Sequence, residues 1–196
     1  MSPKNSIDSP LHIAELEVSK AGGRLGLTLC PGKKDLPYRW ARDLKLDLRV
    51  VRSWGASAVV TLIEDHEFAL LGVEDLGDQI REVGMVWVHL PIRDVDVPDD
   101  RFESGWAAVG PEVHQRLDVG ERILIHCRGG LGRTGLVAGL ILAERGVAPR
   151  DAVLRVRAAR QNAIETSEQE KYVLRAARTV RTAAISALEG KNPCQR

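Results

Sequence analysis

The sequence has few cysteines, no excess of one charge and no long apolar run, and each absence excludes a class of protein. Three cysteines occur in 196 residues without a Cys-x-x-Cys pair, so neither a disulfide framework nor a metal site is expected. This favours a reducing, cytoplasmic setting. Lys and Arg number 28 against 27 Asp and Glu, so we expect no binding of nucleic acid or of an anionic membrane.

No segment approaches the ~18 apolar residues that a membrane-spanning helix needs. We interpret residues 1–10 as a polar leader without the apolar stretch of a signal peptide, and residues 190–196 as a tail. The length suits one domain, so we expect a single domain over 1–196, with a monomer as the default state.

The chain alternates short apolar segments with helical patterns. Strands are predicted at 12–18, 24–29, 57–63, 85–90 and 122–126. Helices are predicted at 40–54, 74–83, 102–118, 133–145, 149–160 and 167–189, the last capped by Thr166 or Ser167. This order predicts an α/β fold, in which a central, largely parallel twisted sheet of about five strands is flanked by helices.

One segment carries clear chemical meaning because it joins a buried strand to a helix through a glycine-rich loop. It reads His126-Cys127-Arg128-Gly129-Gly130-Leu131-Gly132-Arg133-Thr134-Gly135. A cysteine in this position lies beneath the unpaired amides and partial positive charge of a helix N-terminus, which stabilise a thiolate and bind phosphate. Three glycines let the backbone curl so that amides of residues 128–133 point inward. Cys127 is therefore the candidate nucleophile, and Arg133 can hold two phosphate oxygens.

Other loop residues have candidate supporting roles. We expect His126 to support the loop by hydrogen bonds and to help keep the thiolate deprotonated. The Thr134 hydroxyl can donate to the sulfur when a phosphocysteine breaks down. Arg128 either reads substrate charge or is simply solvated.

A leaving oxygen needs a proton, and a carboxylic acid on a mobile loop is the expected donor. The loop at 91–100 offers Asp94, Asp96, Asp99 and Asp100. Spacing alone does not choose among them, although Asp99 and Asp100 also fit the acidic start of a helix.

Two other functions match parts of the same region less well. Residues 130–135 fit the G-x-G-x-x-G dinucleotide fingerprint, but that fold needs a second strand ending in an acid about 20 residues later, where a helix is predicted. Residues 139–160 could form a helix–turn–helix, but the balanced charge and the apolar stretch 136–142 argue against DNA binding.

The His-Cys-x5-Arg-Thr/Ser-Gly pattern resembles the signature of the protein tyrosine and dual-specificity phosphatases. Within them, the sequence is most similar to the kinase-associated phosphatases, the cyclin-dependent kinase inhibitor 3 group, and their bacterial relatives. Three blocks carry this resemblance: Leu27 to Gly32 (LTLCPG), Leu90 to Asp94 (LPIRD) with Pro98, and His126 to Arg133. Together they suggest similarity over most of residues 11–185.

The resemblance implies a phosphatase-like fold and a hydrolase that uses no cofactor or metal and forms a phosphocysteine intermediate. It implies a phosphorylated protein as substrate and a kinase as a candidate partner. It places the general acid four residues before a proline, which selects Asp94 over Asp96. A phosphoinositide or inositol phosphate phosphatase, and a phospho-binding module without turnover, stay open as alternatives.

The family's late Gln-Thr…Gln block appears here as Glu165-Thr166 followed by Gln169. The first Gln positions water in tyrosine-specific members, so its replacement by Glu165 makes Gln169 a candidate for that role. Cys30 is interpreted as a buried structural thiol, with a resolving partner for oxidised Cys127 as the alternative.

Overall fold

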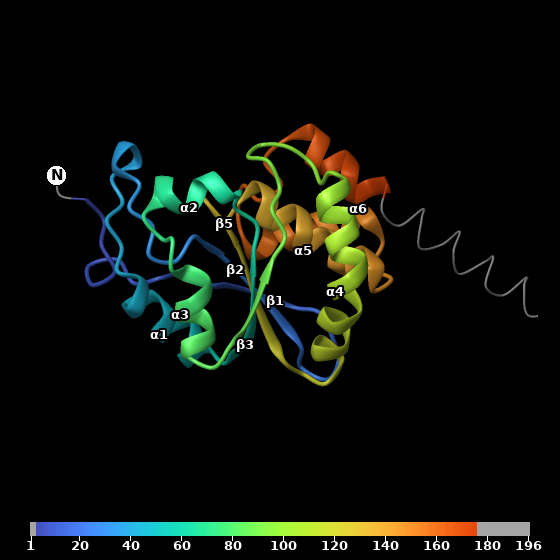
Figure 1. The fold of residues 1–196 in the computed structure, drawn as a ribbon. Coiled ribbons are helices and arrows are strands. Elements are labelled where there is room, and N and C mark those ends of the chain that lie inside the picture. Colours follow the sequence, from blue (N-terminus) through green and yellow to red (C-terminus); the bar gives the residue numbers. More distant parts are fainter. Residues whose placement is uncertain (1–2, 176–196) are drawn as a thin grey trace, which may run out of the picture.

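A five-stranded sheet forms the centre of the structure, a computed structural model that describes residues 3–175 (Figure 1). The strands are β1 (Ala14–Glu17), β2 (Arg24–Leu29), β3 (Ala56–Thr61), β4 (Val86–His89) and β5 (Arg122–Cys127), in the spatial order β1-β2-β5-β3-β4. β1 runs antiparallel to β2, and the other neighbouring pairs are parallel. The predicted α/β class and largely parallel sheet are confirmed.

Helices cover both faces of this sheet (Figure 1). One side carries α1 (Leu44–Trp54), α2 (Asp65–Leu71) and α3 (Leu76–Glu82), and the other carries α4 (Asp100–Asp118), α5 (Gly132–Glu144) and α6 (Pro149–Ala159). A short 3-10 turn, η1 (Leu36–Tyr38), lies between β2 and α1. Residues 167–175 are also helical. The rest of the helix predicted to 189, and the predicted tail, lie outside the described residues.

The alternation of side chains along β5 builds two cores. Ile123, Ile125 and Cys127 face the cluster formed with α4, α5 and α6, whereas Leu124 packs into the cluster formed with α1 and α3. In α5 every residue from 132 to 143 is buried, which explains the apolar stretch in the sequence as a core helix.

β5 is the central strand, and the predicted phosphate loop begins at its carboxyl end. β2 and β3 run parallel on either side, with Leu29 paired to Cys127 and Thr61 paired to His126. Because parallel strands end on the same edge, the loops after β2, β3, β4 and β5 converge there. Open α/β sheets bind ligands outside this edge.

The polar N-terminal segment is tied to the connection before α1. The Lys4 amide donates to the Arg39 carbonyl at 2.8 Å, and the Asp43 amide donates to Ser6 Oγ at 2.9 Å. Within residues 3–175, no helix combines the length and apolar character needed to cross a bilayer.

Candidate active site

The loop after β5 curls around the sulfur of Cys127, which is 3% exposed. The Gly130 amide donates to Sγ at 3.2 Å. Gly130 has a φ of 71°, and a Cβ on it would lie 2.2 Å from the Thr28 carbonyl oxygen, so this turn requires glycine. α5 begins at Gly132, so the amides of its first turn lack partners within the helix. The sulfur thus lies where backbone amides and a helix N-terminus meet.

Cations hold the outer side of this loop through its carbonyl groups. Lys33 Nζ donates to the Arg128 carbonyl at 3.0 Å, and Arg160 donates to the carbonyls of Gly130 and, at 3.3 Å, of Gly129. A peptide's C=O and N–H point in opposite directions, so an outward carbonyl turns the next amide inward. Burial lowers the pKa of Lys33 and of Arg160. Both cations therefore orient loop amides toward Cys127.

Arg133 is 1% exposed, and acceptors from two other segments fix its guanidinium. Glu67 of α2 accepts from Nη1 at 2.5 Å and from Nη2 at 3.0 Å, and the Ile92 carbonyl accepts from Nη1 at 3.1 Å. Burial opposes both charges, but their bidentate pairing outweighs it, so the pKa of Arg133 is raised and that of Glu67 is lowered. Nε of Arg133 has no partner among the described residues, so this buried donor is available to an oxyanion.

The aspartates of the 91–100 loop take different positions. Asp94 Oδ1 lies 2.8 Å from Nη2 of Arg133, and the Asp94 side chain is 49% exposed. Asp96 Oδ2 lies 3.6 Å from the guanidinium of Arg93. Asp99 caps α4 and Asp100 is its first residue, as the acidic start of a helix predicts. Asp94 is thus the aspartate that the structure places against Arg133.

His126 is fully buried in a row of hydrogen bonds. Its Nε2 lies 2.8 Å from Thr61 Oγ1, which also accepts from Trp87 Nε1 at 2.9 Å. A hydroxyl has one proton and two lone pairs, so Thr61 Oγ1 can accept from Trp87 and also hydrogen-bond to His126 Nε2. Nδ1 of His126 is buried and has no hydrogen-bond partner among the described residues. Burial lowers the pKa of His126 to about 3. At neutral pH the ring links β5 to β3 and brings no positive charge to the sulfur.

Arg128 and Thr134 do not contact the sulfur with their side chains. Arg128 pairs with Asp35 through Nε at 2.9 Å and Nη2 at 3.0 Å, and its guanidinium lies 5.1 Å from the ring centre of Tyr38. Its side chain is therefore neither free in solvent nor directed at Cys127. The Thr134 hydroxyl is buried without a hydrogen-bond partner in the described part of the chain, so its donation to sulfur stays a prediction.

The late block, residues 165–169, contacts both the phosphate loop, residues 127–133, and the aspartate loop, residues 91–100. Glu165 Oε2 accepts from the Gly132 amide at 2.7 Å, which puts a carboxylate on one of the loop amides. Gln169 is fully buried and its carboxamide is bonded at both ends, to the backbone of Glu165 and Thr166 and to the Asp96 carbonyl. The Asp96 carbonyl uses one of the two N–H groups of the Gln169 carboxamide, and a role for Gln169 in orienting water stays a prediction. Glu165 is the side chain of this block that hydrogen-bonds to the loop.

Cys30 and Cys127 are both free thiols. Cys30 is fully buried, and burial raises the pKa of its thiol far above the ordinary value. This environment matches the predicted structural thiol, because a buried protonated sulfur is a poor nucleophile. A resolving role for Cys30 stays a prediction.

Four residues that shape the site are absent from the sequence-based hypothesis: Lys33, Asp35, Glu67 and Arg160. A signal existed for Glu67, because Glu64-x-x-Glu67 forms a capping box at the start of α2. The other three act through backbone carbonyls or a distant side chain, which leave no local pattern.

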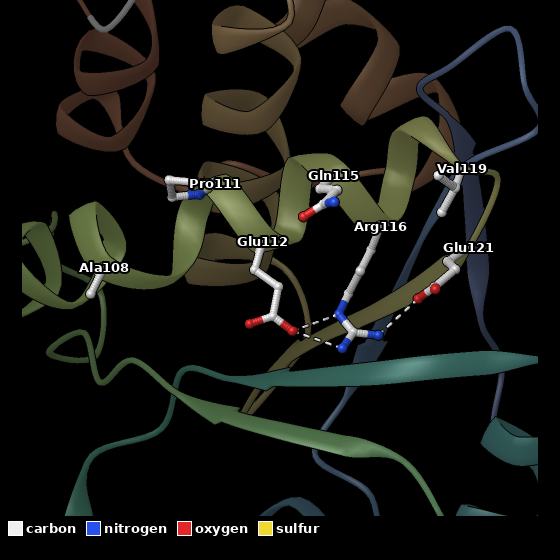
Figure 2. A pocket seen from close by; sticks show the side chains of 7 residues that line it. All are labelled: Ala108, Pro111, Glu112, Gln115, Arg116, Val119 and Glu121. Carbon is white, nitrogen blue, oxygen red and sulfur yellow. Dashed lines mark hydrogen bonds and ion pairs between the residues drawn. The ribbon is translucent and has the colours of Figure 1, made fainter.

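A shallow hollow lies elsewhere, along the C-terminal half of α4 (Figure 2). Its only cation, Arg116, is neutralised by Glu112 at 2.7 Å and by Glu121 at 2.9 Å. Glu121 precedes β5 whereas Cys127 ends it, so the strand separates this hollow from the phosphate loop by about 20 Å at about 3.3 Å per residue. The hollow offers no nucleophile and no free charge.

Comparisons with known proteins show which family the chain resembles. The family model of cyclin-dependent kinase inhibitor 3 matches residues 2–153. Mouse cyclin-dependent kinase inhibitor 3 is 31% identical over 175 residues, covering 87% of this chain and 81% of that protein. The human protein is 30% identical over 176 residues, with the same coverage.

Solved structures of phosphatases have a similar fold. A crystal structure of kinase-associated phosphatase, with its catalytic-site cysteine replaced by serine, has a TM-score of 0.78 at 28% identity and covers 88% of this chain and 97% of that chain. The active form of Tk-PTP has a TM-score of 0.61 at 28% identity, covering 84% and 97%. The chain belongs to the cyclin-dependent kinase inhibitor 3 family, within the protein tyrosine and dual-specificity phosphatases.

Proposed function

We propose that this protein hydrolyses phosphate esters through a phosphocysteine intermediate, with Cys127 as nucleophile and Arg133 as phosphate clamp. One observation carries the proposal: a sulfur that accepts a loop amide at 3.2 Å shares its loop with a fixed guanidinium whose buried Nε has no partner among the described residues. Amides and guanidinium together can stabilise the thiolate and then the equatorial oxygens of the transferring phosphoryl group.

In the first step, Sγ of Cys127 attacks phosphorus in line, so an S–P bond forms as the P–O bond to the leaving group breaks. The Asp94 carboxyl gives its proton to the leaving oxygen. Without substrate, Asp94 pairs with Nη2 of Arg133. A phosphoryl oxygen of the substrate would take the place of Asp94 on Nη2, and the Asp94 carboxyl would then lie beside the ester oxygen.

In the second step, water attacks the phosphocysteine and gives a proton to the Asp94 carboxylate. The S–P bond breaks, Cys127 leaves as a thiolate, and inorganic phosphate is released. Asp94 ends the cycle protonated, as it began, so the same residue serves both steps.

A phosphorylated protein is the proposed substrate, and a kinase is the first candidate. The curated relatives are named as inhibitors of a cyclin-dependent kinase, and a similar solved structure is named a kinase-associated phosphatase. A lipid substrate is less well supported because Arg128, the other basic side chain of the loop 127–133, is already paired with Asp35. The loop therefore offers no spare cation for additional ring phosphates.

Hydrolysis of p-nitrophenyl phosphate tests the proposal. Cys127→Ser should abolish turnover while tungstate still binds in calorimetry, and Arg133→Ala should lose both. Turnover by Cys127→Ser would refute the mechanism, and a wild-type protein that binds tungstate without hydrolysis would be a phospho-binding module. Substrate can then be captured with Asp94→Ala and identified by mass spectrometry.

A further inference from the structure

Gln169 connects the aspartate loop to the segment 164–166, and we propose that it is a positioning residue for proton transfer by Asp94. The inference rests on the proposed function, since it concerns the general acid of that reaction. The Gln169 side chain would hold the aspartate loop in place so that the Asp94 carboxyl stays beside Arg133.

The contacts of the carboxamide use both of its ends. Oε1 of Gln169 accepts from the amides of Glu165 at 3.0 Å and Thr166 at 3.3 Å, and Nε2 donates to the Asp96 carbonyl at 3.1 Å. The side chain is fully buried, so water does not compete for these bonds. A single amide group therefore joins two segments that are 73 residues apart in sequence.

The loop that carries Asp94 is anchored on both sides of it. The Ile92 carbonyl accepts from Arg133, and the Asp96 carbonyl accepts from Gln169. Asp94 lies midway, two residues from each anchor. Losing the anchor at Asp96 would leave the acid attached on one side only, and the geometry of its carboxyl would no longer be fixed.

Backbone strain lies beside both ends of this connection. Val95, between Asp94 and Asp96, has a φ of 64°, and Ile164, before Glu165, has a φ of 60°. A β-branched side chain is unfavourable in the left-handed region, and such residues persist only where surrounding contacts impose them. The bond from Gln169 to the Asp96 carbonyl is a contact that can impose the conformation of Val95.

The alternative explanation is that Gln169 only caps a helix, and the two roles use different atoms. Thr166 and Gln169 form a capping box: Thr166 Oγ1 accepts from the Gln169 amide at 3.1 Å, while Gln169 Oε1 accepts from the Thr166 amide. The box needs only the oxygen, and glutamate supplies it equally well. The Nε2 donor serves the aspartate loop alone.

Gln169→Glu therefore removes the loop anchor and keeps the cap, whereas Gln169→Met removes both without adding a charge. Glu168→Gln, at the exposed neighbouring position, is the matched control. We measure kcat and KM for p-nitrophenyl phosphate, which has a good leaving group, and for phenyl phosphate, which has a poor one. Both Gln169 variants should lose about tenfold in kcat for phenyl phosphate, a part of the 10²–10⁴ that general acids supply, and little for p-nitrophenyl phosphate.

A double-mutant cycle with Asp94→Ala then separates positioning from general damage. In the Asp94→Ala background, Gln169→Met should cause no further loss on phenyl phosphate. Equal losses on both substrates, or a loss that persists without Asp94, would overturn the inference. If the wild type hydrolyses neither ester, the proposed function has failed instead.

Discussion

Acidification should destabilise this protein through one buried imidazole. Burial lowers the pKa of His126 to about 3 in the folded protein, against 6.5 for an exposed ring. Between these values the unfolded chain binds a proton at His126 that the folded protein does not, so the free energy of unfolding rises with pH in this interval. The stabilisation is complete above pH 6.5 and is lost progressively as the pH falls toward 3.

The expected size follows from the distance to the ordinary pKa. At pH 5.0 the unfolded ring is about 1.5 pH units below its pKa, and at about 1.4 kcal/mol per unit the loss relative to neutral pH is about 2 kcal/mol. The lowered pKa of Glu67 does not contribute at pH 5.0, because the stabilisation from a depressed carboxyl pKa is lost only below the ordinary value of 4.5. The interval from pH 7.0 to 5.0 therefore reports mainly on histidines.

Urea unfolding at pH 7.0 and 5.0 measures this effect. The wild type should lose about 2 kcal/mol more than His126→Gln, which cannot titrate, and His12→Gln at an exposed position should behave as the wild type. In NMR, the His126 ring should show no titration above pH 4. Equal losses in the wild type and His126→Gln, or a ring that titrates near 6.5, would refute the argument.

Three further predictions concern the charges of the site. Asp94→Ala should slow hydrolysis of phenyl phosphate more than of p-nitrophenyl phosphate, and the same pattern in Asp96→Ala instead would show that the acid is misassigned. Glu67→Gln leaves Arg133 buried without its countercharge, so urea unfolding should show a loss of about 3–5 kcal/mol in the free energy of unfolding. Inhibition by vanadate should also weaken, and unchanged inhibition would show that Glu67 does not position Arg133 for anion binding. Glu165→Gln replaces a charged acceptor on the Gly132 amide by a neutral one, a difference of about 1 kcal/mol, so vanadate should bind about fivefold more tightly; unchanged or weaker binding contradicts this.

The sequence predicted best what is built from neighbouring residues. β5, the glycine-rich turn and α5 follow one another without a gap, so hydrophobic runs and glycine spacing were enough to place Cys127 and Arg133 in one loop. The choice of Asp94 needed the family resemblance, because four aspartates lie within seven residues. The structure then separates them by position, with Asp94 on Arg133 and Asp99 at a helix cap.

What the sequence could not predict depends on contacts between distant segments. Glu67 lies on α2, a seven-residue helix too short for a clear period, and it meets Arg133 across 66 positions. The family resemblance makes Gln169 a candidate for positioning water because Glu165 stands where the family has its first Gln. Only the fold shows that the Asp96 carbonyl, 73 residues away, uses the amide's donor.

The local charge of the site is also invisible in the composition, which is nearly balanced. Four cations surround the loop, and they differ in their acceptors. Arg128 pairs with Asp35, while Lys33 and Arg160 donate to loop carbonyls and have no ion-pair partner within 4.0 Å among the described residues. Arg133 pairs with Glu67 and Asp94 and keeps Nε unused.

Because their acceptors differ, the four cations have different roles in binding an anion. Arg128 is neutralised by its partner, whereas Lys33 and Arg160 turn amides inward and keep their positive charge on the outer side of the loop. Arg133 alone among them presents a buried donor without an acceptor within residues 3–175. An arriving oxyanion would therefore be attracted by two uncompensated charges but would be held by one guanidinium and the loop amides. This is why removing Arg133 should abolish binding, while replacing Lys33 or Arg160 should disturb the shape of the loop as well as its charge.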